Sequence, residues 1–193
     1  MKKYRRIAII TVMLTVFLLI VGCAGKSGYM MVTAAPVAGP APDKALVYVM
    51  RPSGIGLAVN FQIWDSDHFV GLSQAKSYFA YECAPGTHLF IGIAENKVAI
   101  QADLAAGKSY YVGTNIRAGW SKARMQFTPV TRGSELWDKV EAYKPRLHCI
   151  AANEEWRAKW EAAKKPEVLT LIDYFTNGAG TSSVLKLSKE DGR

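Results

Sequence analysis

The chain has 193 residues, half of them hydrophobic, and a formal net charge of +8. This length is enough for one domain with a buried core. Four cations, Lys2, Lys3, Arg5 and Arg6, lie within the first six residues, and no basic run of five or more occurs elsewhere. The composition therefore argues against a nucleic-acid partner.

The first predicted element is an apolar segment over residues 7–22, whose only polar members are Thr11 and Thr15. As a helix it would span about 24 Å, which is less than the roughly 30 Å hydrocarbon layer of a bilayer. A basic head, a short apolar run and a small residue at its end are typical of a secretory signal peptide. We therefore expect residues 1–22 to be a signal peptide. The alternative is an uncleaved membrane helix with an incidental cysteine.

The end of this segment, Ile20-Val21-Gly22-Cys23, resembles the lipobox of bacterial lipoproteins, in which a branched apolar residue and two small or tolerant residues precede a cysteine. The resemblance implies cleavage before Cys23, a diacylglycerol on its thiol and a further acyl chain on its amine. Two or more acyl chains anchor a protein stably on a membrane. The residue after Cys23 is Ala24 rather than Asp. In a Gram-negative lipoprotein this resemblance implies sorting to the outer membrane.

Residues 23–44 are predicted to form a tether after the lipidated cysteine. They contain three prolines and many small residues and show no sustained period. Such a segment would span about 25 Å as a flexible coil and about 65 Å as a polyproline helix. Cleavage would leave 171 residues and lower the net charge by four, to +4. We expect one domain held just off the membrane surface.

Short runs rich in Val, Ile, Tyr and Phe, separated by Gly, Pro, Asn and Asp, fill residues 45–130. Such runs, with turns every eight to twelve residues, predict an antiparallel sandwich or barrel rather than a parallel sheet. The expected strands are 45–51, 59–64, 69–73, 78–83, 87–94, 98–104, 109–116 and 122–129. We expect a mainly β fold: an antiparallel β-sandwich of seven or eight short strands with two C-terminal helices.

A helical extension is predicted over residues 131–175. Its second helix begins after Asn153, with acidic residues in its first turn and basic residues in its last, as the helix dipole favours. After Pro166, residues 167–175 are interpreted as one further strand, and residues 176–193 as a mobile tail. The apolar stripe of the second helix is expected to pack on the β domain, the alternative being a partner or a membrane.

The β segment also resembles a known family in the order of its landmarks. These are an aromatic strand that ends in Arg-Pro, a short hairpin, a Pro-Gly-x-His turn and a Gly-Lys-x-Tyr-Tyr strand. The residues are Tyr48, Arg51 and Pro52; 64–71; Pro85, Gly86 and His88; and Gly107, Lys108, Tyr110 and Tyr111. Over about residues 44–130 they resemble the bacterial lipoprotein domain called domain of unknown function family 2846. The resemblance implies a small sandwich of the PEGA and carboxypeptidase-regulatory type, and no activity.

Few residues are candidates for chemistry. Asp65, Asp67 and His68 have side chains that could ligate a metal, but strand-like runs on both sides predict a hairpin turn instead. Cys83 and His88 flank the Pro-Gly turn as a candidate cysteine–histidine pair. The sequence shows no third group to orient that pair, and we predict no metal and no cofactor.

Two cysteines, Cys83 and Cys149, remain besides Cys23. In an oxidising periplasm these two thiols could form a disulfide, which would stabilise the fold by a few kcal/mol. The alternative is two separately buried thiols, because free cysteine is an ordinary core residue. The sequence leaves both alternatives open.

Two classes of function follow from these observations. The first is a non-enzymatic interaction or envelope-structural module, anchored in membrane lipid through Cys23 on the periplasmic face of the outer membrane and bound to an unidentified envelope protein. The second is a hydrolase or metal-dependent enzyme that uses Cys83, His88 or Asp67. Because the sequence contains no complete catalytic motif, we favour the first. An open pocket that gathers His88, Cys83 and a carboxylate would favour the second.

Overall fold

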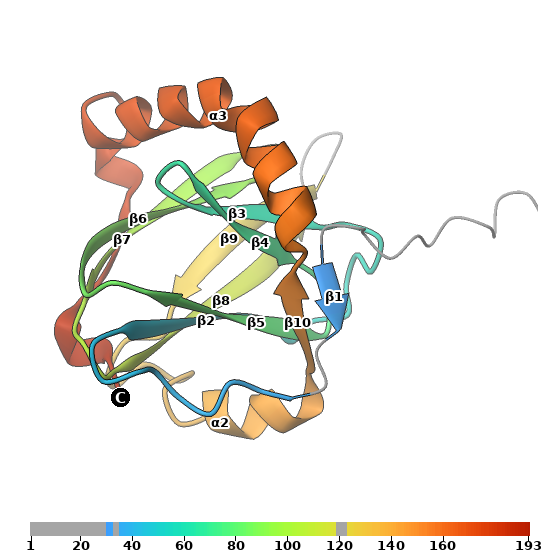
Figure 1. Ribbon diagram of the computed structural model, residues 1–193, viewed down its shortest axis with the longest axis vertical. Helices are drawn as coiled ribbons and strands as arrows, with labels where there is room; N and C mark the ends of the chain where they lie inside the picture. Colours follow the sequence, from blue (N-terminus) through green and yellow to red (C-terminus); the bar gives the residue numbers. More distant parts are fainter. Residues whose placement is uncertain (1–29, 33–34, 119–122) are drawn as a thin grey trace, which may run out of the picture.

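The computed structural model describes residues 30–32, 35–118 and 123–193. In it two β-sheets pack face to face, with a long C-terminal helix over one sheet and a short helical segment against the other (Figure 1). The predicted signal peptide and Cys23 lie outside the described residues. Among the helices of the described ranges, none has the length and apolar character needed to cross a bilayer.

The described residues form eleven strands. They are β1 Met30–Val32, β2 Ala45–Arg51, β3 Phe61–Asp65, β4 His68–Ser73, β5 Ser77–Cys83, β6 Gly86–Ile93, β7 Lys97–Leu104, β8 Ser109–Ala118, β9 Ala123–Pro129, β10 His148–Ala152 and β11 Leu185–Leu187. All eight strands predicted within residues 45–130 are confirmed, with ends shifted by at most two residues. Alternating and β-branched apolar runs bounded by turn residues are local signals, which is why they place strands well.

The larger sheet has the strand order β1-β10-β5-β2-β8-β9, and the smaller one has the order β11-β7-β6-β3-β4. Most neighbouring strands are antiparallel, but β2 and β8, β10 and β5, and β11 and β7 pair in parallel. The prediction of a purely antiparallel sandwich of seven or eight strands is therefore wrong in pairing and in strand number. Strand signals are local, whereas the direction of pairing depends on connections that the pattern does not show.

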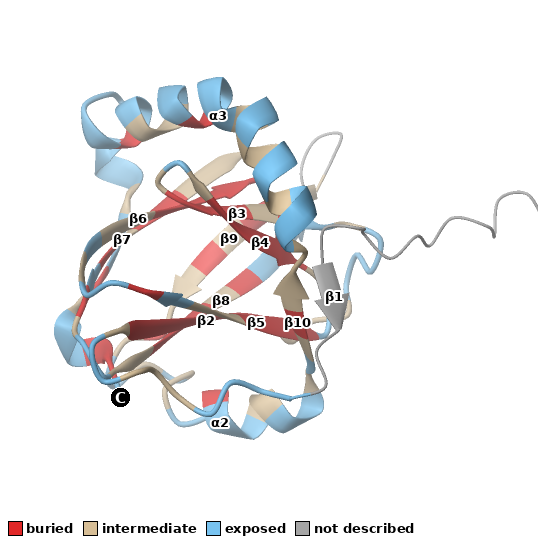
Figure 2. Ribbon diagram, viewed as in Figure 1, coloured by how far each residue is buried: buried red, intermediate tan, exposed pale blue. Residues whose placement is uncertain are grey.

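The main core lies between the two sheets and beneath the long helix. Its largest fully buried members include Trp64, Phe69, Phe79, Phe90 and Phe127. Buried residues concentrate on the strands, and exposed residues cover the outer side of the helix (Figure 2). The long helix thus packs on the smaller sheet and extends the core beyond the space between the two sheets.

A second apolar cluster lies on the outer face of the larger sheet. Every residue of β2 is buried, because one of its faces joins the main core and the other joins this second cluster. Tyr48 and Tyr111 stack there with ring centroids 5.1 Å apart, and Lys144 Nζ lies 4.1 Å from the Tyr48 ring. These two tyrosines therefore serve the packing of the fold.

The two predicted helices are unequal. The first, α2, spans only Val140–Tyr143 and continues as a 3₁₀ turn over Lys144–Arg146. The second, α3, spans Glu154–Thr176, and Asn153 is its N-cap, because the side chain of Asn153 accepts a hydrogen bond from the Trp156 backbone N–H at 3.2 Å. Between them runs β10, which joins the larger sheet.

The further strand predicted over residues 167–175 is wrong, because α3 continues through Pro166. Val168 and Phe175 are buried in the core, and Leu171 and Ile172 pack against it, with the spacing of one helix face. Packing of this face offsets the hydrogen bond that a proline removes from a helix. The helix changes direction along its length, as expected of one with an internal proline (Figure 1).

The predicted mobile tail over residues 176–193 is also wrong. It forms β11 between two 3₁₀ turns, Thr181–Ser183 and Lys189–Asp191. Leu187 is buried, and Asp191 accepts a hydrogen bond from the Arg132 backbone N–H at 2.7 Å. The last residue, Arg193, exchanges two backbone hydrogen bonds with Ser109. Tertiary contacts therefore hold the end of the chain to both sheets.

Part of the predicted tether also belongs to the fold. β1 pairs antiparallel with β10, from Met30 opposite Ala152 to Val32 opposite Ile150. Farther along, the Val37 carbonyl accepts a hydrogen bond from the Tyr48 hydroxyl at 3.2 Å, and the Ala41 N–H donates to Glu82. The predicted tether is thus held to the domain from β1 onwards in the described residues.

Candidate functional site

A nearly buried polar cluster is built around Asp65, the last residue of β3. Its Oδ2 accepts hydrogen bonds from His88 Nδ1 at 2.7 Å and from the Tyr81 hydroxyl at 3.1 Å. His88 belongs to β6, next to β3 in the smaller sheet, and Tyr81 reaches across from β5 of the larger sheet. The side chains of Asp65 and His88 are only 8% and 16% exposed. In this Asp65 cluster the nearly buried ion pair links two strands of the smaller sheet, and the Tyr81 hydroxyl joins it to the larger sheet.

The histidine of this cluster is held in its charged form. Hydrogen bonds to Asp65 and then to Cys83 raise the pKa of His88 to about 10, although burial opposes this. His88 Nε2 lies 2.9 Å from the Ala84 carbonyl oxygen, so each ring nitrogen of the imidazolium donates to an acceptor. Burial also raises the pKa of Tyr81. A general base needs a free ring nitrogen, which this arrangement does not offer.

The structure brings together the cysteine and histidine singled out in the sequence and adds the carboxylate that the sequence did not reveal. Cys83 is the last residue of β5, lies beside His88 and is 7% exposed. Its sulfur atom is 3.8 Å from the Ala45 carbonyl oxygen. A cavity of about 350 Å³ opens at His88 and is also lined by Thr181 and Lys186, but not by Cys83. His88 therefore interacts with both Asp65 and Cys83, and of the cysteine–histidine pair only His88 lines the cavity.

Asp65 went unrecognised as the partner of His88 because their contact depends on strand pairing. Asp65 lies opposite Phe90 in the β3–β6 ladder, and His88 is two residues before Phe90 on the same face. Only a sequence reading that had paired these two strands in this register would have found the contact.

The other acidic and imidazole groups of the Asp65–His68 segment lie apart from this cluster. The hairpin turn predicted there is confirmed between β3 and β4. Asp67 forms an ion pair with Lys165 at 2.8 Å, and the hydrogen bond from Lys165, followed by its positive charge, lowers the pKa of Asp67. His68 lies 2.7 Å from Glu161 of α3. Across the ranges that the structure describes, no three histidine, cysteine, aspartate or glutamate side chains lie close enough together to hold a metal ion.

Cys83 and Cys149 do not form a disulfide in the structure. Cys149 lies opposite Tyr78 in the β10–β5 pairing, and Cys83 is five residues farther along β5. This separation is about 17 Å, and the odd offset places the two side chains on opposite faces of the sheet. A disulfide needs Cα atoms within about 7 Å of each other. Of the two alternatives that the sequence left open, the structure has the separate thiols.

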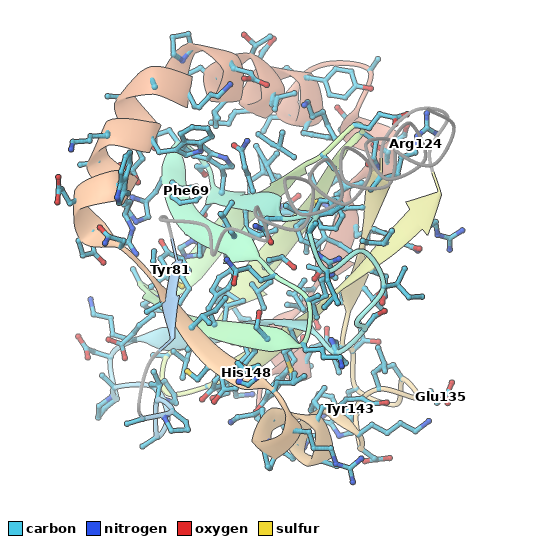
Figure 3. The ribbon with its side chains drawn as sticks, turned by 90° about the vertical axis from the view of Figure 1, so that its right-hand side faces the viewer. Phe69, Tyr81, Arg124, Glu135, Tyr143 and His148 are labelled. Carbon is cyan, nitrogen blue, oxygen red and sulfur yellow. The ribbon has the colours of Figure 1, made fainter. Side chains whose placement is uncertain are left out.

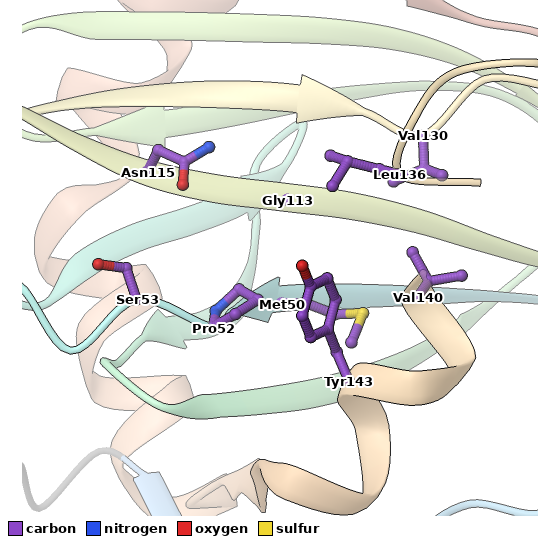
Figure 4. Close-up of a pocket in the computed structure, with 9 residues that line it drawn as sticks. All are labelled: Met50, Pro52, Ser53, Gly113, Asn115, Val130, Leu136, Val140 and Tyr143. Carbon is purple, nitrogen blue, oxygen red and sulfur yellow. The ribbon is translucent and has the colours of Figure 1, made fainter. Parts of the chain in front are cut away.

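A second candidate site is an apolar cleft between the larger sheet and α2 (Figure 4). Its volume is about 260 Å³. The lining residues are Met50, Pro52, Ser53, Gly113, Asn115, Val130, Leu136, Val140 and Tyr143. Apolar walls with a few polar groups are typical of sites for small apolar ligands. The sequence predicted a helix here but no cleft, because the opposing wall comes from distant strands.

Arg51 is buried, and within the described residues it has no carboxylate partner. Its guanidinium donates to four backbone carbonyl oxygens: Val59 at 2.6 Å, Ile55 at 2.8 Å, Gly56 at 3.0 Å and Ser73 at 3.3 Å. Its Cζ also lies 4.9 Å from the centre of the Phe61 ring. Three of these carbonyls belong to the β2–β3 loop, residues 52–60. Arg51 therefore fixes the conformation of this loop.

Comparison with protein-family models, with curated proteins and with solved structures found no match for this chain. The family resemblance of the landmarks therefore stays a prediction.

Proposed function

We propose that this protein is a lipid-anchored, non-enzymatic module of the bacterial cell envelope. In this proposal Cys23 carries the acyl chains, the sandwich lies on the periplasmic face of the outer membrane, and its partner is an envelope protein. The motif at residues 20–23 supports the anchoring, and the order of landmarks supports a lipoprotein domain of family 2846.

The observation that carries the non-enzymatic part is the geometry of His88. Both of its ring nitrogens serve as hydrogen-bond donors, one to Asp65 and one to Ala84. The neighbouring thiol of Cys83 is buried in the core. The two side chains suited to acid–base and nucleophilic chemistry thus serve the hydrogen bonding and packing of the fold.

Lipid labelling tests the proposal. Full-length protein expressed in bacteria with labelled palmitate should carry the label and fractionate with membranes, because acyl chains on Cys23 anchor it. Cys23→Ser should keep the uncleaved precursor mass and take up no label. Cys149→Ser is the matched control and should take up as much label as the protein without substitutions. Label that enters the Cys23→Ser variant would contradict the proposal.

One observation favours the second candidate function, an enzyme with a cysteine nucleophile. Cys83, His88 and Asp65 lie together in the order of a nucleophile, a base and an orienting carboxylate. For catalysis, Cys83 would have to become accessible and His88 would have to release the Ala84 carbonyl. The reactivity of the Cys83 thiol therefore distinguishes the two functions.

Thiol alkylation measures that reactivity. In unfolded, unreduced protein both Cys83 and Cys149 should titrate as free thiols. In the folded protein the half-buried Cys149 should react first, and Cys83 should react only as fast as the sandwich opens, because it lies in the core. Rapid alkylation of native Cys83 that His88→Gln abolishes would contradict the non-enzymatic proposal.

A further inference from the structure

The β2–β3 loop carries the two most exposed large apolar side chains of the described residues. Ile55 is 72% exposed and Leu57 is 69% exposed. None of the residues 52–60 is charged. Single exposed aliphatic residues are common, but two at the tip of one uncharged loop form a local apolar projection.

This projection has a fixed conformation. Arg51 holds the carbonyls of Ile55, Gly56 and Val59, and the Val59 N–H donates to the Gly56 carbonyl at 2.9 Å. Gly56 has a φ of +66°, and a Cβ there would come within 2.4 Å of Ile116 Cδ1. A loop that is already ordered loses little conformational entropy when it binds a surface.

Cations flank the projection. Lys76, in the turn between β4 and β5, is exposed, and its side chain lies against Gly54. Arg117 is exposed next to Ile116, which contacts the loop. Arg124 of β9, labelled in Figure 3, lies opposite Arg117 in the β8–β9 ladder and forms an ion pair with Glu95. Exposed cations attract the headgroups of anionic lipids.

The loop also lies on the side of the molecule from which the chain would reach its anchor. β1 and the β2–β3 loop occupy the same side of the sandwich (Figure 1). From Cys23 to Met30 the chain has seven Cα–Cα steps, which span at most about 25 Å. An acylated Cys23 would therefore keep this side close to the bilayer.

We infer that the β2–β3 loop docks on the lipid bilayer, with Ile55 and Leu57 inserted at the boundary between headgroups and acyl chains and the cations against anionic lipid headgroups. The inference rests on the proposed lipid anchor and deepens it. The anchor supplies attachment to the membrane, and the loop supplies one orientation of the sandwich on it. The Asp65 cluster and the cleft beneath α2 would then take constant positions relative to the membrane.

Photo-crosslinking from the bilayer tests the inference. Full-length protein expressed in bacteria is reconstituted in vesicles of phosphatidylethanolamine and phosphatidylglycerol that contain a phospholipid with a diazirine in its acyl chain. Mass spectrometry of the digested protein should find lipid adducts on the β2–β3 loop. Ile55→Ser with Leu57→Ser should lose these adducts. Leu169→Ser with Leu185→Ser, which also changes two exposed leucines, should keep them.

The same spectra report whether Cys23 is acylated. Acyl chains on Cys23 without adducts on the loop would overturn the docking inference and leave the proposed function standing. Loop adducts that persist in the Ile55→Ser, Leu57→Ser variant would also overturn it. An unacylated Cys23 would overturn the proposed function, and the inference with it.

Discussion

Asp65→Asn should lower the free energy of unfolding by about 3 kcal/mol at neutral pH, because the substitution removes the charge that faces the buried His88 imidazolium. Urea unfolding measures this effect. Asp67→Asn is the matched control, two residues away. Its ion pair with Lys165 is about half exposed, so its loss should cost less than about 1 kcal/mol. Equal effects of the two substitutions would contradict the stabilising role of the Asp65 cluster.

The cost of Asp65→Asn should also depend on pH. The pKa of His88 is about 10 in the folded protein, and an unfolded histidine titrates near 6.5. The stability that the pair supplies is therefore fully present below pH 6.5 and is lost as the pH rises through about 10. The difference in unfolding free energy between the unmodified protein and Asp65→Asn should shrink from pH 6.5 to 9.5. A difference that stays constant over this range would contradict the assignment of a charged His88.

Arg51→Met should lower the free energy of unfolding by about 3 kcal/mol, because four backbone carbonyls lose their donor. Protease should also cleave the β2–β3 loop faster, since three of those carbonyls belong to it. Arg51→Lys should recover only part of the stability, because an ammonium does not reproduce the donor fork of a guanidinium.

Arg117→Met provides the matched control for Arg51. Arg117 is exposed on β8, so its replacement should change the unfolding free energy by less than about 0.5 kcal/mol. If Arg51→Met and Arg117→Met unfold at the same urea concentration and are cleaved at the same rate, the proposed role of Arg51 in holding the loop is wrong.

The candidate site shows how far pattern reasoning extends. Cys83 and His88 were found from the sequence because they flank one turn, only five residues apart. Asp65 was assigned to a hairpin turn, and that turn is confirmed, yet its carboxylate points back into the sandwich toward His88. The direction of that side chain depends on the β3–β6 register and on Tyr81 of the other sheet, and neither is a local property.

What the sequence by itself determined is the set of strands within residues 45–130, the turns between them and the N-cap at Asn153, because each depends on residues a few positions apart. The tertiary structure alone decided the parallel pairing of β2 with β8, the addition of β1, β10 and β11 to the sheets, and the continuation of α3 through Pro166. These features depend on buried contacts between distant segments. The energy of such contacts overrides local preferences, such as that of a proline to end a helix or of a terminal segment to be disordered.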